Sequence, residues 1–184
     1  QHAPAQPQDP DAPPARTERS LATEPARLSF GQVSIVDGRL EADVRIENLG
    51  GHKLPTGYPS RRAWIHLVVR DGGGRVVFES GAVKADGSIA GNDNDADPAT
   101  FEPHYAVVRN AGDVQIYESV MGDTREVVTT GLLSASQYLK DNRLLPRGFD
   151  KRTAEPDIAV RGSAAGDPDF TGGGDRGRYA LGLG

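Results

Sequence analysis

The chain has 184 residues, of which 36% are hydrophobic and 26% charged, and it carries a net charge of -5 with a pI near 5.4. It contains no cysteine, which excludes disulfide bonds, a thiolate nucleophile, cysteine-ligated metals and covalently attached c-type haem. The acidic balance and the scattered arginines argue against nucleic acid as a partner. The longest apolar stretch, residues 63–69, is too short to span a bilayer, so no transmembrane segment is predicted.

Residues 1–26 are rich in proline and almost free of large apolar side chains. Such a segment cannot bury enough surface to offset the entropy lost on ordering, so we predict a flexible, proline-rich arm or linker. The remaining residues, 27–184, are predicted to form a single β-sandwich domain. Because the chain begins with Gln1 rather than Met, as a protein does after removal of a signal peptide, we expect a periplasmic or extracellular location.

From Leu28 onward, apolar and polar residues alternate with the period of two that is typical of half-buried strands. Asp37-Gly38 separates the first two alternating runs and predicts a hairpin turn. The predicted strands cover residues 28–35, 40–47, 63–69, 76–78, 105–109, 114–121, 125–129, 157–160 and 178–183.

One segment, residues 132–142, has apolar residues spaced for one face of a helix and is followed by Pro146-Arg147-Gly148, which ends a helix. Many short strands between glycine-rich turns predict an all-β fold. We expect an antiparallel β-sandwich of immunoglobulin-like or jelly-roll-like type, with this one short helix in a long connection.

The densest group of turn residues is the stretch 50–64, GGHKLPTGYPSRRAW, which runs directly into a predicted strand. Its glycines and prolines restrict the backbone, and rigid loops that present polar side chains are where binding sites tend to lie. We interpret Lys53, Tyr58, Arg61 and Arg62 as candidate partner-binding residues, because arginine suits bidentate contacts with carboxylates. The alternative is a structural connection between two sheets, with its arginines in solvent.

A second polar loop, residues 91–98, alternates carboxylates and amides and is followed by Glu102. Hard oxygen ligands of this kind suit calcium, so the candidate calcium ligands are Asp93, Asn94, Asp95, Asp97 and Glu102. The loop is not an EF-hand, since Pro98 and His104 stand where that motif needs Gly and Glu. The alternative is a solvated acidic turn, because Asn and Asp are common turn residues.

Two histidines in loops, His52 and His104, form a candidate site for a transition metal such as copper, zinc or iron. His66 could join them, but its place within a predicted strand favours an ordinary packed histidine. The sequence lacks the helical zinc-binding motif of metalloproteases, the nucleophile elbow of hydrolases, the P-loop and the dinucleotide fingerprint. We therefore predict no catalytic residues from motifs.

Residues 48–64, with GHKLPTGYPSRRAW at their centre, resemble a domain of bacterial multihaem cytochromes c, in which a cysteine-rich haem domain is followed by a β-sandwich. The resemblance continues at residues 91–95, 102–105, 114–118, 138–151 and 157–160. It implies an exported protein of a Gram-negative bacterium that works beside respiratory electron transfer. Since the chain contains no CxxCH motif, haem is expected only in a partner domain or protein.

These observations leave three functions open. The first is a non-catalytic accessory β-sandwich that binds or positions a redox partner, namely a multihaem cytochrome c domain or protein. The second is a metal-binding protein or metal-dependent enzyme that uses His52 and His104. The third is a structural module in which calcium, bound at residues 93–97, staples a long loop.

Overall fold

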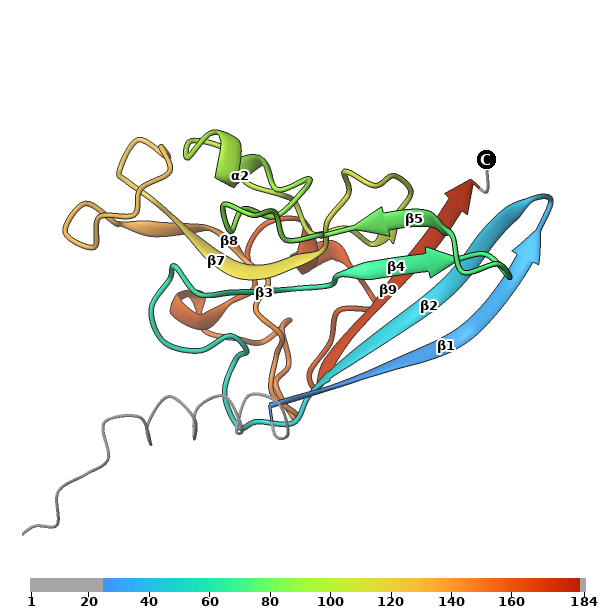
Figure 1. Cartoon of the computed structure of the whole chain (residues 1–184). Coiled ribbons are helices and arrows are strands. Elements are labelled where there is room, and N and C mark those ends of the chain that lie inside the picture. The colour runs from blue at the N-terminus through green and yellow to red at the C-terminus, as the bar shows by residue number, and fades with distance from the viewer. Residues whose placement is uncertain (1–24, 183–184) are drawn as a thin grey trace, which may run out of the picture.

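The largest sheet begins with the hairpin that the alternating sequence predicts. The computed structural model describes residues 25–182, and in this range nine strands form three sheets (Figure 1). β1 (Ala26–Val36) and β2 (Arg39–Asn48) are antiparallel and joined at Asp37-Gly38, where both residues have a positive φ. Glycine adopts this conformation without strain, and aspartate tolerates it.

The other neighbour of β2 is the last strand of the described range, β9 (Gly174–Gly182), which is also antiparallel to it. A short strand, β6 (Val107–Val108), pairs in parallel with β9 and completes the strand order β1-β2-β9-β6. The first and last strands of the described chain are thus separated by one strand only.

The second layer consists of two smaller antiparallel sheets. β3 (Arg62–Trp64), β7 (Ile116–Gly122) and β8 (Gln137–Asp141) form one sheet in the order β3-β7-β8. β4 (Leu67–Arg70) and β5 (Val76–Ser80) form the other. The single strand predicted over residues 63–69 is therefore divided at Ile65-His66 between two sheets.

The core lies between these layers. Val44 and Leu181 of the first sheet share one buried cluster with Leu67 of β4 and Tyr117 of β7, together with Phe170 from a connection. Face-to-face packing of this kind defines a sandwich, so the all-β sandwich predicted from the sequence is confirmed. No helix in the described range is long and apolar enough to cross a membrane.

The helix predicted over residues 132–142 was wrong. Leu132 and Leu133 lie in a turn and are 55% and 106% exposed, and the segment continues as β8, with Lys140 and Asp141 buried. The spacing of the apolar residues suggested a helix, but pairing with β7 buries the polar residues instead. The α-helix of the described range is α2 (Asp93–Ala96), a single turn within the long connection after β5.

Two predicted strands and one predicted boundary also differ. Residues 125–129 form a turn in which the Asp123 carboxylate accepts bonds from the N–H groups of Arg125 and Val127. Residues 156–158 form a 3₁₀ helix with Pro156 at its start, rather than a strand. Residues 1–24 of the predicted arm lie outside the described residues. The predicted boundary after residue 26 differs from the structure, because β1 begins at Ala26.

Two leucines provide a matched test of this core. Leu144 is fully buried, whereas Leu133 is fully exposed. We expect Leu144→Ala to lower the free energy of unfolding by about 2–5 kcal/mol, because it leaves a cavity among packed side chains. Leu133→Ala should change it by about 0.5 kcal/mol or less. Urea denaturation of both variants measures the difference, and equal losses would contradict the packing described above.

Candidate functional site

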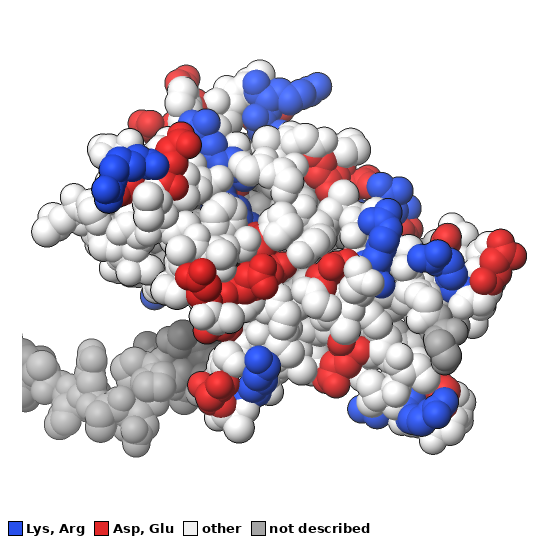
Figure 2. Space-filling view, turned by 90° about the horizontal axis from the view of Figure 1, so that it is seen from above, with Lys and Arg blue, Asp and Glu red and all other residues white. Residues whose placement is uncertain are grey.

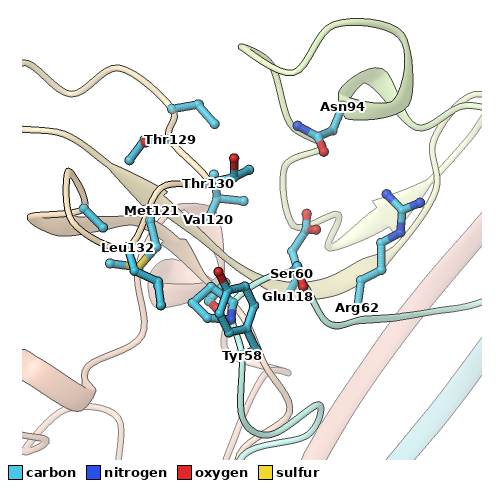
Figure 3. Close-up of a pocket in the computed structure, with 14 residues that line it drawn as sticks. Tyr58, Ser60, Arg62, Asn94, Glu118, Val120, Met121, Thr129, Thr130 and Leu132 are labelled. Atoms are coloured by element: carbon cyan, nitrogen blue, oxygen red, sulfur yellow. The ribbon is translucent and has the colours of Figure 1, made fainter.

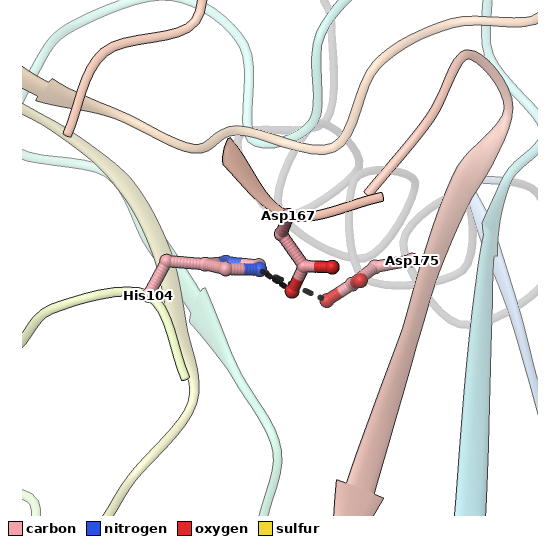
Figure 4. Close-up of side chains that lie close together, drawn as sticks. All are labelled: His104, Asp167 and Asp175. Atoms are coloured by element: carbon pink, nitrogen blue, oxygen red, sulfur yellow. Dashed lines mark hydrogen bonds and ion pairs between the residues drawn. The ribbon is translucent and has the colours of Figure 1, made fainter. Parts of the chain in front are cut away.

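His104 lies at the centre of a buried polar cluster (Figure 4). Its side chain is 1% exposed, and its Nε2 lies 3.3 Å from Asp167 Oδ2 and 3.8 Å from Asp175 Oδ2. His104 precedes β6, Asp167 follows a 3₁₀ turn, and Asp175 stands near the start of β9. The ring of Phe170 packs edge-on against the imidazole with 5.0 Å between the ring centroids, so the cluster is closed by apolar surface.

Two amides determine which nitrogen of His104 carries the proton. Gln115 Nε2 lies 2.7 Å from His104 Nδ1, and Asn142 Nδ2 lies 3.2 Å from the same atom. Gln115 is held in this orientation because its Oε1 accepts a bond from the N–H of Tyr105. Asn142 is held because its Oδ1 accepts from the N–H of Glu118.

Since both amides present N–H groups to Nδ1, this nitrogen must accept hydrogen bonds. The neutral imidazole therefore carries its proton on Nε2, where it is donated to Asp167. Burial lowers the pKa of His104 to about 4, although the nearby Asp167 acts in the opposite direction. The ring is thus neutral at ordinary pH and fixed in one tautomer.

Asp175 is the second unusual group of the cluster. Burial raises the pKa of Asp175 to about 6, against the effect of the Tyr117 hydroxyl, which donates to Oδ2 over 2.7 Å. The nearby charge of Asp167 raises this pKa further. The other oxygen, Oδ1, is buried and has no hydrogen-bond partner within the described residues. An unpaired carboxylate oxygen in such a place favours the protonated acid.

The donor atoms of His104, Asp167 and Asp175 lie within 4.8 Å of one another, a spacing that suits a metal ion. The hydrogen bonds nevertheless favour a proton at this place. A neutral histidine that binds metal through Nε2 carries its proton on Nδ1 and donates it to an acceptor. Here two donors face Nδ1, so metal binding would have to turn both amides or remove the last ring proton. His52 is exposed and is not part of this group.

The predicted calcium ligands lie on and after α2, and several of their oxygen atoms already have protein partners. Both oxygens of Asp95 accept bonds from Arg62, and Oδ2 also accepts from the N–H of Ile89. Asp97 Oδ1 accepts from the N–H of Ala99.

The same holds at the end of the loop. Glu102 is 2% exposed and accepts bonds from the N–H of Asp93 and the hydroxyl of Tyr105. Asn94 donates its amide to the carbonyl of Thr100. These contacts stabilise the loop and involve several of the oxygen atoms that the sequence assigned to calcium.

The four predicted partner-binding residues have different surroundings. Lys53 is nearly buried, and its Nζ donates to Asp141 and to the carbonyl of Ile158. Arg61 donates to a carbonyl of its own loop, and Arg62 is paired with Asp95. Tyr58 is 50% exposed.

Tyr58 lines a groove, which we call the Tyr58 groove (Figure 3). It encloses a cavity of about 130 Å³. Figure 3 shows Tyr58, Met121 and Leu132 toward one side, Arg62 and Asn94 toward the other, and Glu118 between them. The groove is formed by residues 58–60 and 62 before and within β3, Asn94 of α2, residues 118–121 of β7, and residues 128–130, 132 and 135.

Glu118 lies between the two sides of the groove, and we call it the floor of the groove; it belongs to a buried ion pair. Lys140 Nζ lies 2.9 Å from Glu118 Oε1 and also donates to the carbonyl of Ile116. Asn142 fixes the backbone of Glu118 from the other side. The amide that orients His104 therefore also positions the floor of the Tyr58 groove.

Sequence reasoning identified His104, Tyr58 and Arg62 but missed most of the buried cluster. Asp167 and Asp175 flank the glycine run 172–174, and two acidic residues around a tight turn were the available signal. Gln115 and Asn142 gave no signal, since neutral amides within or beside strands look like ordinary polar positions.

No family model, curated protein or solved structure matches the chain.

The pH dependence of stability tests the cluster. Because the pKa of Asp175 is higher in the folded state, the protonated side chain adds to the free energy of unfolding. This contribution is complete below about pH 4 and is lost as the pH rises to about 6. The lowered pKa of His104 acts with the opposite sign, since its contribution is present above pH 6.5 and lost as the pH falls to about 4. The two slopes oppose each other between pH 4 and 6.

Asp175→Asn removes the contribution to the free energy of unfolding that falls as the pH rises, and it leaves the contribution of His104, which rises with pH. We expect the free energy of unfolding of this variant to rise with pH more steeply than in the wild type, by up to about 1.4 kcal/mol per pH unit. Exposed Asp157→Asn makes the same charge change and serves as the control. Urea titrations at several pH values measure the slopes, and identical slopes in all three proteins would contradict the description of Asp175.

Proposed function

We propose that this domain is a non-catalytic binding module that docks a multihaem c-type cytochrome, present as a separate domain or protein, through the Tyr58 groove. The observation that carries the proposal is the exposed apolar rim over a rigid floor. Tyr58 and Leu132 line the groove and are 50% and 55% exposed, and adjacent Leu133 is fully exposed. Exposed aromatic and aliphatic side chains around a preformed hollow are typical of protein-binding sites.

The charges of the groove indicate what the partner presents. Arg62 is paired with Asp95, and the buried Lys140 is paired with Glu118. Neither of these two cations is therefore free to contact a partner. Figure 2 shows a group of acidic side chains near the centre of the upper face and acidic and basic side chains interspersed around it. A partner loop with an apolar side chain beside a lysine or arginine complements this surface.

The chemistry of the buried cluster supports a binding role rather than an enzymatic one. A general acid or base must come within hydrogen-bond reach of its substrate. His104 and Asp175 are the groups with strongly shifted pKa values that would suit such a role, but their side chains are both 1% exposed and enclosed by other residues. We infer that the cluster holds the fold together while the groove makes contact with the partner.

The resemblance of residues 48–64 to the sandwich of multihaem cytochromes supports the class of partner and a periplasmic or extracellular place of action. The structure assigns Arg61 and Arg62 contacts within the chain. The proposed contacts with the partner accordingly shift from these arginines to Tyr58 and Leu132. The transition-metal and calcium alternatives receive less support, because His52 lies outside the His104 cluster and the acidic loop is held by its own hydrogen bonds.

A comparative capture experiment tests this proposal. The immobilised domain is exposed to a periplasmic extract, and captured protein is measured by haem staining. Leu132→Asp should reduce the haem signal at least about tenfold, because it places a charge on the apolar rim.

Val83→Asp changes an equally exposed aliphatic residue that is not among the residues lining the groove, and it should capture as much haem protein as the wild type. Equal haem signals from the wild type and both variants, or no haem signal with the wild type, would refute the proposed function.

A further inference from the structure

β1 carries a strip of exposed apolar side chains that the fold leaves uncovered. Leu28, Phe30, Val33 and Ile35 are 56%, 63%, 55% and 68% exposed. We call these four residues the β1 strip. Contiguous exposed apolar surface on a folded domain marks an interaction site more often than scattered single residues do.

The β1 strip lies on the core-facing side of its sheet. Its members pair across the ladder with alternate residues of β2, in the pairs Leu28↔Ile46, Phe30↔Val44, Val33↔Ala42 and Ile35↔Leu40. Alternate residues of a strand share one face. Since Ala42 and Val44 are buried in the core on that face, the β1 strip continues the core surface beyond the edge of the second layer.

β1 is also an open edge. Within the described residues it pairs with β2 alone, and Figure 1 shows it as the outermost strand of its sheet. Natural edge strands are usually protected by charge, proline or shortness. β1 has 11 residues, no proline, and Arg27 as its one charged residue. Both the backbone edge and the apolar face are thus available to another strand.

We infer that β1 pairs with β1 of a second copy of this chain, in an antiparallel arrangement about a two-fold axis. The β-bulge between Phe30 and Val33 makes the strip symmetric, since consecutive residues of the strip are two, three and two positions apart in the sequence. An axis midway between Gly31 and Gln32 then places Phe30 opposite Val33 of the second copy and Leu28 opposite Ile35. All four side chains of each strip remain on one face.

The symmetric spacing of the strip and the composition of β1 favour a second copy as the occupant. The chain has a net charge of -5, so most of its surface would repel another copy, but β1 brings only Arg27 to the contact, opposite the apolar Val36. Residues 1–24 contain Leu21 as their one large aliphatic side chain, so their composition does not suit them to cover the strip. This inference is independent of the proposed function, which uses the Tyr58 groove.

Charge substitution and complementation test the inference on the full chain. Sedimentation equilibrium over a range of concentrations should show a monomer–dimer equilibrium for the wild type. Phe30→Glu and Val33→Lys should each raise the dissociation constant at least about tenfold, because each places a charge opposite an apolar residue. Val83→Lys, at an equally exposed site outside the sheet, should leave it unchanged.

Mixing the two variants tests the register itself. In a mixed dimer, Glu at position 30 of one chain lies opposite Lys at position 33 of the other, and the remaining pair is the original Phe30 with Val33. The mixture should therefore dimerise more tightly than either variant alone. Circular dichroism checks that each variant is folded. A wild type with the mass of one chain at every concentration, unchanged dimerisation in the variants, or a mixture no tighter than its components would overturn the inference.

Discussion

The fold depends on a hydrogen-bonded imidazole that is buried between two amides and two carboxylates. His104 connects the segment before β6 with the residue before β7 through Gln115, with the residue after β8 through Asn142, and with the turn at Asp167. His104 and Asp167 lie in connections outside the strands, and the side chain of His104 joins them to residues next to the paired strands β7 and β8. In a buried site, each partner lost would leave an unsatisfied polar group, so the network specifies one arrangement of the connections.

The same network links the interior to the surface. The side-chain oxygen of Asn142 accepts a hydrogen bond from the backbone N–H of Glu118. Lys140 forms an ion pair with the carboxylate of Glu118. Glu118 thus forms a fixed floor for the Tyr58 groove, while the exposed Leu132 of its rim lies in a turn. A rigid floor below adaptable apolar side chains is a suitable arrangement for binding a protein partner.

The sequence predicted those parts of the molecule in which local pattern and burial agree. The β1–β2 hairpin was correct because Asp37-Gly38 permits positive φ and because Val44 and Ala42 alternate with polar residues. The helix at residues 132–142 was wrong because β8 buries Lys140 for its ion pair, which periodicity cannot reveal. The cluster was missed because Gln115 and Asp175 acquire their roles only through contacts between distant segments.

The tautomer of His104 determines the hydrogen bonds of the whole cluster, and ¹⁵N NMR of the histidine side chains measures it directly. We expect an unprotonated Nδ1 and a protonated Nε2 for His104, unchanged between pH 5 and 8, since its pKa is lowered to about 4. A proton on Nδ1, or a ring that becomes charged within this range, would contradict the arrangement of the two amides. It would also reopen Nε2 as a ligand for a metal ion.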